Sequence, residues 1–114
     1  MPEISITAPD GGTFSAYLAL PEATPAPAIL VIQEIFGVNQ VMRDICDWLA
    51  GEGYAACCPD IFWRIEPGIQ LTDKSEAEWQ RAFELFQAFD VDKGVGDLKA
   101  TLDALRGNPA VSYT

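Results

Sequence analysis

The residues Ala28-Ile29-Leu30-Val31-Ile32 form a continuous apolar run in which hydrophobic and polar side chains do not alternate. A strand buried on both faces has this pattern, and such strands belong mostly to parallel sheets that helices cover. The preceding segment, residues 21–27, carries prolines at positions 21, 25 and 27 and therefore cannot be helical. We expect a stiff extended connection that leads into a buried strand over residues 28–32.

A helix and a second strand follow this run. After a loop over residues 33–39, we predict a helix that Asn39 caps and that Gly51 and Gly53 end. Residues 54–58 form a short apolar strand, which Pro59-Asp60 stops. The apolar face of the helix is predicted to comprise Val41, Ile45, Trp48 and Leu49. Strand, helix and strand at this spacing make a right-handed crossover unit, so we predict an α/β fold with a mostly parallel sheet and helices on both faces.

An antiparallel hairpin is expected before this unit. Residues 3–7 and 13–18 both alternate polar and apolar side chains, the pattern of a half-buried strand. Between them, Pro9-Asp10-Gly11-Gly12 has the composition of a turn.

A loop and two helices are predicted in the second half of the chain. Residues 61–73 have no clean period and contain Pro67-Gly68, and loops of this length are often functional. Ser75 with Glu78 forms a capping box for one helix, and Asp90 begins another that ends at Gly107. The predicted apolar faces are Trp79, Ala82, Phe83 and Phe86 on the first helix, and Val91, Val95, Leu98, Leu102 and Leu105 on the second. Residues 110–114 read as the approach to a further strand.

The composition narrows the function classes. The 114 residues suffice for one domain or less, and 49% of them are hydrophobic, which argues against disorder. The formal net charge is −10, and the seven basic residues are scattered among acids. Nucleic-acid and membrane-surface partners are therefore not expected. The N-terminus lacks the features of a signal peptide and no apolar run could span a membrane, so we expect a cytoplasmic protein.

Histidine and cysteine content limits the chemistry. The chain has no histidine, which excludes a self-contained Ser-His or Cys-His pair and a His-ligated zinc site within these residues. The three cysteines, Cys46, Cys57 and Cys58, have neither a CxxC nor a metal-ligand spacing. We expect no metal and no cofactor.

Glu34 is the first candidate functional residue. In open α/β sheets, ligands bind outside the carboxyl ends of the strands, and Glu34 follows such an end. A carboxylate followed by a turn at Gly37 can direct an ionisable group and backbone N–H donors toward one point. Taken alone, the same residue could instead cap a helix or face water.

Three blocks of sequence favour the functional interpretation. They are Gln33-Glu34-Ile35-Phe36-Gly37-Val38-Asn39, Gly53-Tyr54-Ala55-Ala56-Cys57-Cys58-Pro59-Asp60, and Gln87-Ala88-Phe89-Asp90 with Gly94-Val95-Gly96-Asp97-Leu98. In order and spacing they closely resemble the first half of the dienelactone hydrolase (carboxymethylenebutenolidase) family. The resemblance implies an α/β-hydrolase fold of which residues 1–114 are the amino-terminal half. It also implies a Cys-His-Asp triad that opens a cyclic enol-lactone through an acyl-enzyme.

The resemblance also implies roles for residues of the first block. Glu34 matches the family's glutamate that controls the ionisation of the cysteine nucleophile, and only a thiolate is an effective nucleophile. The backbone N–H of Ile35 corresponds to half of the oxyanion hole, and Phe36 would line the pocket. The nucleophile elbow, G-x-C-x-G in the family, does not occur in these residues, and the three cysteines do not replace it. The remaining half of the hydrolase domain is therefore an expected partner.

Candidate substrate contacts lie later in the chain. Family relatives hold the substrate carboxylate with an arginine, whose position corresponds to Trp79 here, while Arg81 lies two residues away. Arg64 matches an arginine in the relatives' loop and is another candidate. Each arginine could instead be a solvated surface charge. A changed contact set means that the ester or lactone substrate need not be a dienelactone.

Two other classes of protein fit parts of the sequence. A receiver-type signalling domain is acidic and of similar length, and Asp60 at a strand end could be its phosphorylated residue. A non-catalytic α/β binding module would keep the pocket without the chemistry.

Overall fold

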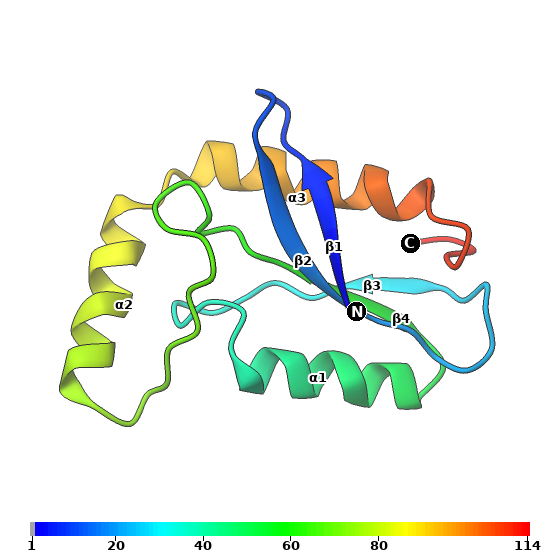
Figure 1. Cartoon of the computed structure of the whole chain (residues 1–114), viewed down its shortest axis with the longest axis horizontal. Helices are drawn as coiled ribbons and strands as arrows, with labels where there is room; N and C mark the ends of the chain where they lie inside the picture. Colours follow the sequence, from blue (N-terminus) through cyan, green and yellow to red (C-terminus); the bar gives the residue numbers. More distant parts are fainter. Residues whose placement is uncertain (1) are drawn as a thin grey trace.

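The computed structural model describes residues 2–114 and contains one four-stranded sheet with three helices (Figure 1). The strands are β1 (Glu3–Thr7), β2 (Thr13–Ala19), β3 (Ala28–Leu30) and β4 (Ala55–Pro59), arranged in the order β1-β2-β4-β3. The helices are α1 (Gln40–Gly51), α2 (Glu76–Ala88) and α3 (Val91–Arg106). Helices α1 and α3 lie on opposite faces of the sheet, whereas α2 lies beyond one end of it (Figure 1).

The predicted hairpin is confirmed. β1 and β2 pair antiparallel with Ser5 opposite Ser15, and the Ala8 N–H donates to the Gly12 carbonyl across the turn. β2 also pairs antiparallel with β4, and only β3 and β4 pair parallel. The sheet of the described residues is therefore mixed rather than mostly parallel.

The crossover from β3 through α1 to β4 is confirmed, but β3 is shorter than the predicted strand over residues 28–32. β4 lies between β2 and β3, and all five of its residues are buried. β3 has a full strand partner on one side only, and Ile32 beyond its end is 55% exposed. The prediction that residues 28–32 are buried on both faces is wrong for this end of the run.

The segment after α3 lies along the outer edge of β3. Ala26 and Val111 form a parallel bridge, and the Ala28 N–H donates to the Tyr113 carbonyl. The expectation that residues 110–114 approach a further strand agrees with this pairing.

The predicted N-caps are confirmed, because Asn39, Ser75 and Asp90 each accept a hydrogen bond from a backbone N–H in the first turn of their helix. The predicted apolar faces, however, are largely wrong. α1 buries Met42 and Cys46, and α2 buries Ala82 and Leu85. The predicted face residues that are instead exposed are Val41, Ile45, Trp48, Trp79, Phe83 and Phe86.

Small side chains explain how α1 is oriented. Met42 and Cys46 pack against Ala19, Ala56 and Cys58 of the sheet. The close approach that these small sheet residues permit leaves Val41, Ile45 and Trp48 exposed, while Leu49 packs against the edge of the cluster.

α3 shows the same departure for a different reason. It buries Leu105, as predicted, but also Gly94, Asp97 and Thr101, whereas Val91 and Val95 are 64% and 59% exposed. Asp97 is fully buried because Trp63 and Arg64 compensate its carboxylate. A prediction based on hydrophobicity places every aspartate on the solvent side of a helix. It therefore assigns the wrong side of α3 to the core, because Asp97 is buried.

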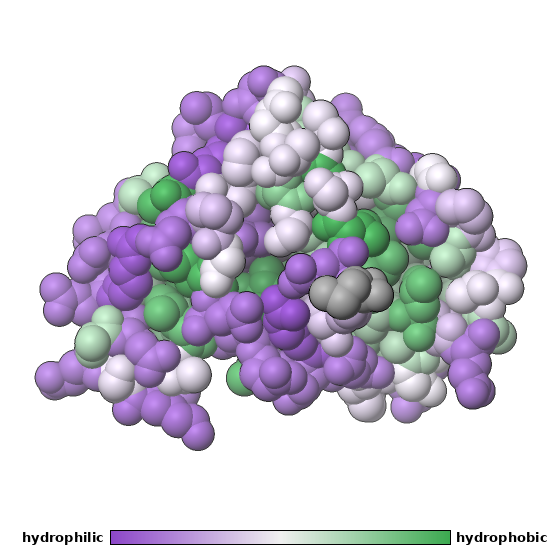
Figure 2. Space-filling view, viewed as in Figure 1, coloured by the Kyte–Doolittle hydropathy of each residue, from purple (hydrophilic) through white to green (hydrophobic). Residues whose placement is uncertain are grey.

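Hydrophilic side chains cover most of the face shown in Figure 2, with apolar patches between them. Within residues 2–114, no helix has the length and apolar character needed to cross a membrane.

Candidate active site

The turn over residues 33–37 follows β3 after two residues, Val31 and Ile32, and is held at both ends. The buried Gln33 side chain accepts a hydrogen bond from the Ile61 N–H at 2.9 Å and donates to the Glu34 carbonyl at 3.1 Å. The Gly37 N–H also donates to the Glu34 carbonyl, at 3.2 Å. Gln33 therefore joins the turn to the end of β4. The sequence alone did not predict that Gln33 joins these two segments. The only indication was its place as the first polar residue after the apolar run of residues 28–32.

This turn presents two groups with catalytic potential. Glu34 is exposed, and Ile35 is half-buried. Within residues 2–114, no group donates a hydrogen bond to the Glu34 carboxylate and none accepts one from the Ile35 N–H. The Glu34 carboxylate and the Ile35 N–H are thus adjacent, and neither has a hydrogen-bond partner among residues 2–114.

An aromatic group lies beside the turn and consists of Phe36, Trp79 and Phe83. Phe36 and Trp79 pack edge to face with ring centroids 5.0 Å apart, and Trp79 and Phe83 follow at 5.7 Å. The indole N–H of Trp79 donates to the Asp73 carbonyl at 2.8 Å. The structure therefore brings together two of the predicted site residues, Phe36 and Trp79.

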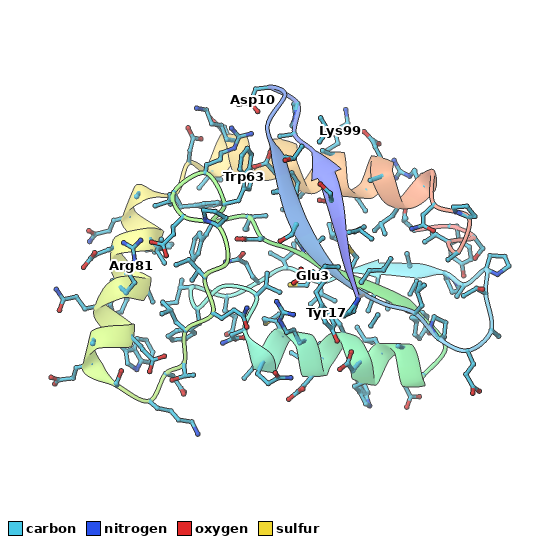
Figure 3. All side chains as sticks on the ribbon, in the orientation of Figure 1. Glu3, Asp10, Tyr17, Trp63, Arg81 and Lys99 are labelled. Atoms are coloured by element: carbon cyan, nitrogen blue, oxygen red, sulfur yellow. The ribbon has the colours of Figure 1, made fainter. Side chains whose placement is uncertain are left out.

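Arg81 is engaged by carboxylates. Its guanidinium lies 2.8 Å from Glu66 and 3.5 Å from Glu84, and its side chain is 36% exposed. Figure 3 shows Arg81 on α2, whereas Asp10 lies at the tip of the β1–β2 hairpin.

Arg64 belongs to a different group of contacts. It pairs with Asp10 of the β1–β2 turn at 2.6 Å and with the fully buried Asp97 of α3 at 2.9 Å. Its guanidinium lies over the Trp63 ring, and the Trp63 indole N–H donates to Asp97. The contacts of Arg64 thus connect the hairpin turn, the long loop and α3, and none of them is with Glu34, Phe36 or Trp79.

Replacing Arg64 by Gln should raise the pKa of Asp10. The hydrogen bond from Arg64 holds that pKa below its ordinary value of 3.8. Because the pKa of Asp10 is lower in the folded than in the unfolded chain, its interaction with Arg64 stabilises the fold at pH values above the unfolded pKa. This stabilisation is lost as the pH falls through the folded-state pKa of Asp10. Carboxyl NMR titration measures the pKa directly. Arg106→Gln, which removes the contact of Arg106 with Asp103, is the control and should leave Asp10 unchanged. An unchanged Asp10 titration in Arg64→Gln would contradict the assignment.

The three cysteines are buried and free. Burial raises the pKa of the Cys57 thiol to about 12. The pKa of Cys58 is also raised, because its thiol hydrogen-bonds with Cys46 and is buried. A raised pKa makes the Cys57 and Cys58 thiols poor nucleophiles. The same hydrogen bond lowers the pKa of Cys46, but this residue is fully buried in the core and so has a packing role.

Asp60 does not fit the receiver interpretation. The side chain is 4% exposed, and its carboxylate accepts hydrogen bonds from the Phe62 and Gly68 N–H groups. Burial raises its pKa. Receiver-type folds also have a parallel sheet, whereas this one is mixed. The receiver interpretation is wrong.

Among residues 2–114, no cluster of His, Cys, Asp or Glu side chains could hold a metal ion.

A mixed sheet with an antiparallel hairpin, a crossover helix and a turn after β3 that presents a carboxylate defines a protein of the α/β-hydrolase class. The chain belongs to the dienelactone hydrolase family, whose sequence model ("Dienelactone hydrolase family") matches residues 14–114.

Relatives and solved structures agree with this family. The chain is 61% identical over 94 residues to the "Putative carboxymethylenebutenolidase" of Azospirillum brasilense, which covers 82% of this chain and 41% of the relative. It is 47% identical over 106 residues to the "Carboxymethylenebutenolidase" of Pseudomonas putida, which covers 93% and 45% respectively. The crystal structure of a "Putative Dienelactone Hydrolase" from Klebsiella pneumoniae superposes with a TM-score of 0.76 at 27% identity, covering 95% of this chain and 45% of that one. The chain thus spans less than half the length of these relatives.

Proposed function

We propose that these residues are the amino-terminal half of a single α/β-hydrolase domain that hydrolyses a lactone or ester. The observation that carries the proposal is the turn after β3, where the exposed Glu34 carboxylate and the Ile35 N–H are adjacent and unengaged by residues 2–114. The relatives that carry the name carboxymethylenebutenolidase support the substrate class. The other half of the domain supplies a Cys-His-Asp triad in this proposal.

The proposed reaction proceeds through an acyl-enzyme. The cysteine thiolate attacks the carbonyl carbon and the carbon–oxygen ester bond breaks, so that the acyl group remains on sulfur. The leaving oxygen takes a proton from the triad histidine and departs as an alcohol, or in a lactone stays on the acyl chain as a hydroxyl or enol. Water then attacks the thioester and releases the acid together with the regenerated thiol. Glu34 controls the ionisation of the cysteine, because a nearby carboxylate can accept the thiol proton. The Ile35 N–H stabilises the negative charge that develops on the carbonyl oxygen.

The substrate contacts remain part of the proposal. We assign Phe36 and Trp79 to the wall of the substrate pocket next to the turn, because Phe36 belongs to the turn and the two rings are in contact. Arg64 and Arg81 stay candidates for anion contacts, although each would first have to leave its carboxylate partners. A cytoplasmic location and a role in the breakdown of aromatic compounds are further predictions.

The test uses the complete natural polypeptide with dienelactone and with phenyl acetate as substrates. We expect both substrates to be hydrolysed, and we expect this activity to be lost when iodoacetamide alkylates the cysteine nucleophile. When the reaction is quenched rapidly, mass spectrometry should detect a fraction of the protein that carries the acyl group. Ligand binding without turnover would favour the non-catalytic binding module instead.

A further inference from the structure

Among residues 2–114, the outer edge of β1 has no strand partner. β1 is the outermost strand of the sheet and pairs with β2 alone (Figure 1). At the opposite edge, the segment around Val111 runs along β3, where the Ala28 N–H donates to the Tyr113 carbonyl. The sheet is therefore extended on the β3 side, and β1 stays at its border. Unpaired N–H and C=O groups at such a border are a template for pairing with another chain.

The hydrogen bonds of the hairpin show which backbone groups point outward from β1. The Pro2 carbonyl accepts a hydrogen bond from the Leu18 N–H, and at the other end of the strand the Ala8 N–H donates to the Gly12 carbonyl. In an antiparallel pair, residues that bond to the neighbouring strand alternate with residues whose N–H and C=O groups point away from it. The even-numbered residues of β1 therefore bond to β2. Within residues 2–114, no hydrogen bond is formed by the outward backbone groups, which belong to Glu3, Ser5 and Thr7.

This edge lacks the features that usually protect an edge strand, which include proline, lysine and β-bulges. β1 has the sequence Glu3-Ile4-Ser5-Ile6-Thr7 and pairs with β2 without a bulge. Its one charged side chain, Glu3, lies 3.3 Å from the guanidinium of Arg43. Because this ion pair compensates the carboxylate, no isolated charge stands at the edge to repel a second strand.

Two copies of β1 match in one antiparallel register, which has a two-fold axis at Ser5. This register brings Ser5 opposite Ser5 of the second copy and Glu3 opposite its Thr7, so that no two carboxylates face each other. Each of these pairs exchanges N–H···O bonds in both directions, whereas a shifted register leaves an outward residue unpaired. On the α3 side, Ile4 comes opposite Ile6 of the second copy. The half-buried Ile4 then loses more of its contact with water.

We propose that β1 is the surface through which this protein binds a second copy of itself, with the two β1 strands paired antiparallel about Ser5 and the two sheets joined into one. The contact is isologous, as in most homodimers. Each strand contributes five residues, which makes the contact small. We therefore expect a weak dimer with a dissociation constant of about 10⁻⁵–10⁻⁴ M. Dimerisation through β1 is independent of the proposed hydrolytic function.

Charge substitutions at the two-fold axis test this contact in the complete natural polypeptide. Sedimentation velocity should show a monomer at concentrations about tenfold below the dissociation constant and a dimer about tenfold above it. Ser5→Lys should weaken dimerisation by about tenfold or more, because two like charges then face each other, and Ser5→Glu should do the same. An equimolar mixture of the two variants should form dimers again, since a lysine then faces a glutamate.

A control variant and hydrogen exchange locate the contact. Ala23→Lys adds the same charge at an exposed residue between β2 and β3, and it should dimerise as the native protein does. The Thr7 amide, which points outward from β1, should exchange more slowly in the native dimer than at concentrations where the protein is monomeric.

Three results would overturn the proposal. The first is a native protein that stays monomeric throughout, and if its Thr7 amide is nevertheless protected, another segment or another protein covers the edge. The second is Ser5→Lys protein that dimerises as well as the native protein, which places the interface on another surface. The third is a mixture of Ser5→Lys and Ser5→Glu that stays monomeric, because the two-fold axis is then not at Ser5.

Discussion

Replacing Glu34 by Gln is expected to lower kcat/KM for ester hydrolysis by about 10²–10⁴-fold, the usual contribution of a positioned general acid or base. Glutamine keeps the shape of the side chain but can neither accept the thiol proton nor carry a negative charge. The variant should fold normally, because the exposed carboxylate accepts no hydrogen bond from residues 2–114. Steady-state kinetics across a range of pH measure the loss and reveal any change in the pH profile.

Glu22→Gln provides the matched control for this experiment. Glu22 is also exposed and lies in the connection between β2 and β3, so the same chemical change is made away from the turn. We expect its kinetics and its thermal stability to match those of the native protein. If Glu34→Gln keeps native kcat/KM and pH profile, Glu34 has no role in controlling the nucleophile.

The local signals in the sequence predicted much of the fold. Asn39, Ser75 and Asp90 each form the predicted cap, because a side-chain oxygen next to the first turn needs no long-range contact to act. The hairpin was equally predictable, since alternation and turn chemistry lie within a few residues of each other. These features depend on residues that are close along the chain.

The features that depend on distant residues could not be predicted in the same way. The burial of Asp97 requires Trp63 and Arg64, which are 34 and 33 residues away. No pattern on α3 alone could indicate that its inner face carries an aspartate. The orientation of α1 likewise depends on small side chains in β2 and β4.

In the candidate site, too, local features could be predicted from the sequence and long-range contacts could not. Glu34 was a candidate because it follows the end of an apolar run, and the structure places it on an exposed turn after β3. The pairing of Phe36 with Trp79 joins residues far apart in the sequence, and only the structure shows it. The ion pairs of Arg64 with Asp10 and Asp97 could not be predicted either, because these residues are 54 and 33 positions away from it in the sequence.

Gly37 is where the shape of the turn is most sensitive to substitution. Its φ is +82°, a conformation that costs an L-residue about 1–2 kcal/mol. A Cβ at this position would also overlap the Ile69 carbonyl, because the loop backbone passes directly over the turn. We expect Gly37→Ala to lower the free energy of unfolding by about 2–5 kcal/mol, from backbone strain and overpacking together. Urea denaturation measures this change.

Gly68 allows the two causes to be separated. Its φ is +81°, nearly the same as that of Gly37, but a Cβ there would meet no atom within 4 Å. Gly68→Ala should therefore cost only the backbone strain, about 1–2 kcal/mol. The difference between the two variants measures the overlap with Ile69. Equal losses would show that the loop moves aside freely.

The same pair of variants connects the shape of the turn with the proposed chemistry. In folded Gly37→Ala, relief of the overlap must move either the loop or the turn, and movement of the turn displaces the Ile35 N–H. Misplacement of a catalytic group by about 1 Å can reduce a rate by about 10²-fold. We expect kcat/KM to fall by that order in Gly37→Ala and to stay near the native value in Gly68→Ala. A fully active Gly37→Ala protein in which the Ile35 amide resonance is displaced would mean that the Ile35 N–H does not stabilise the developing charge.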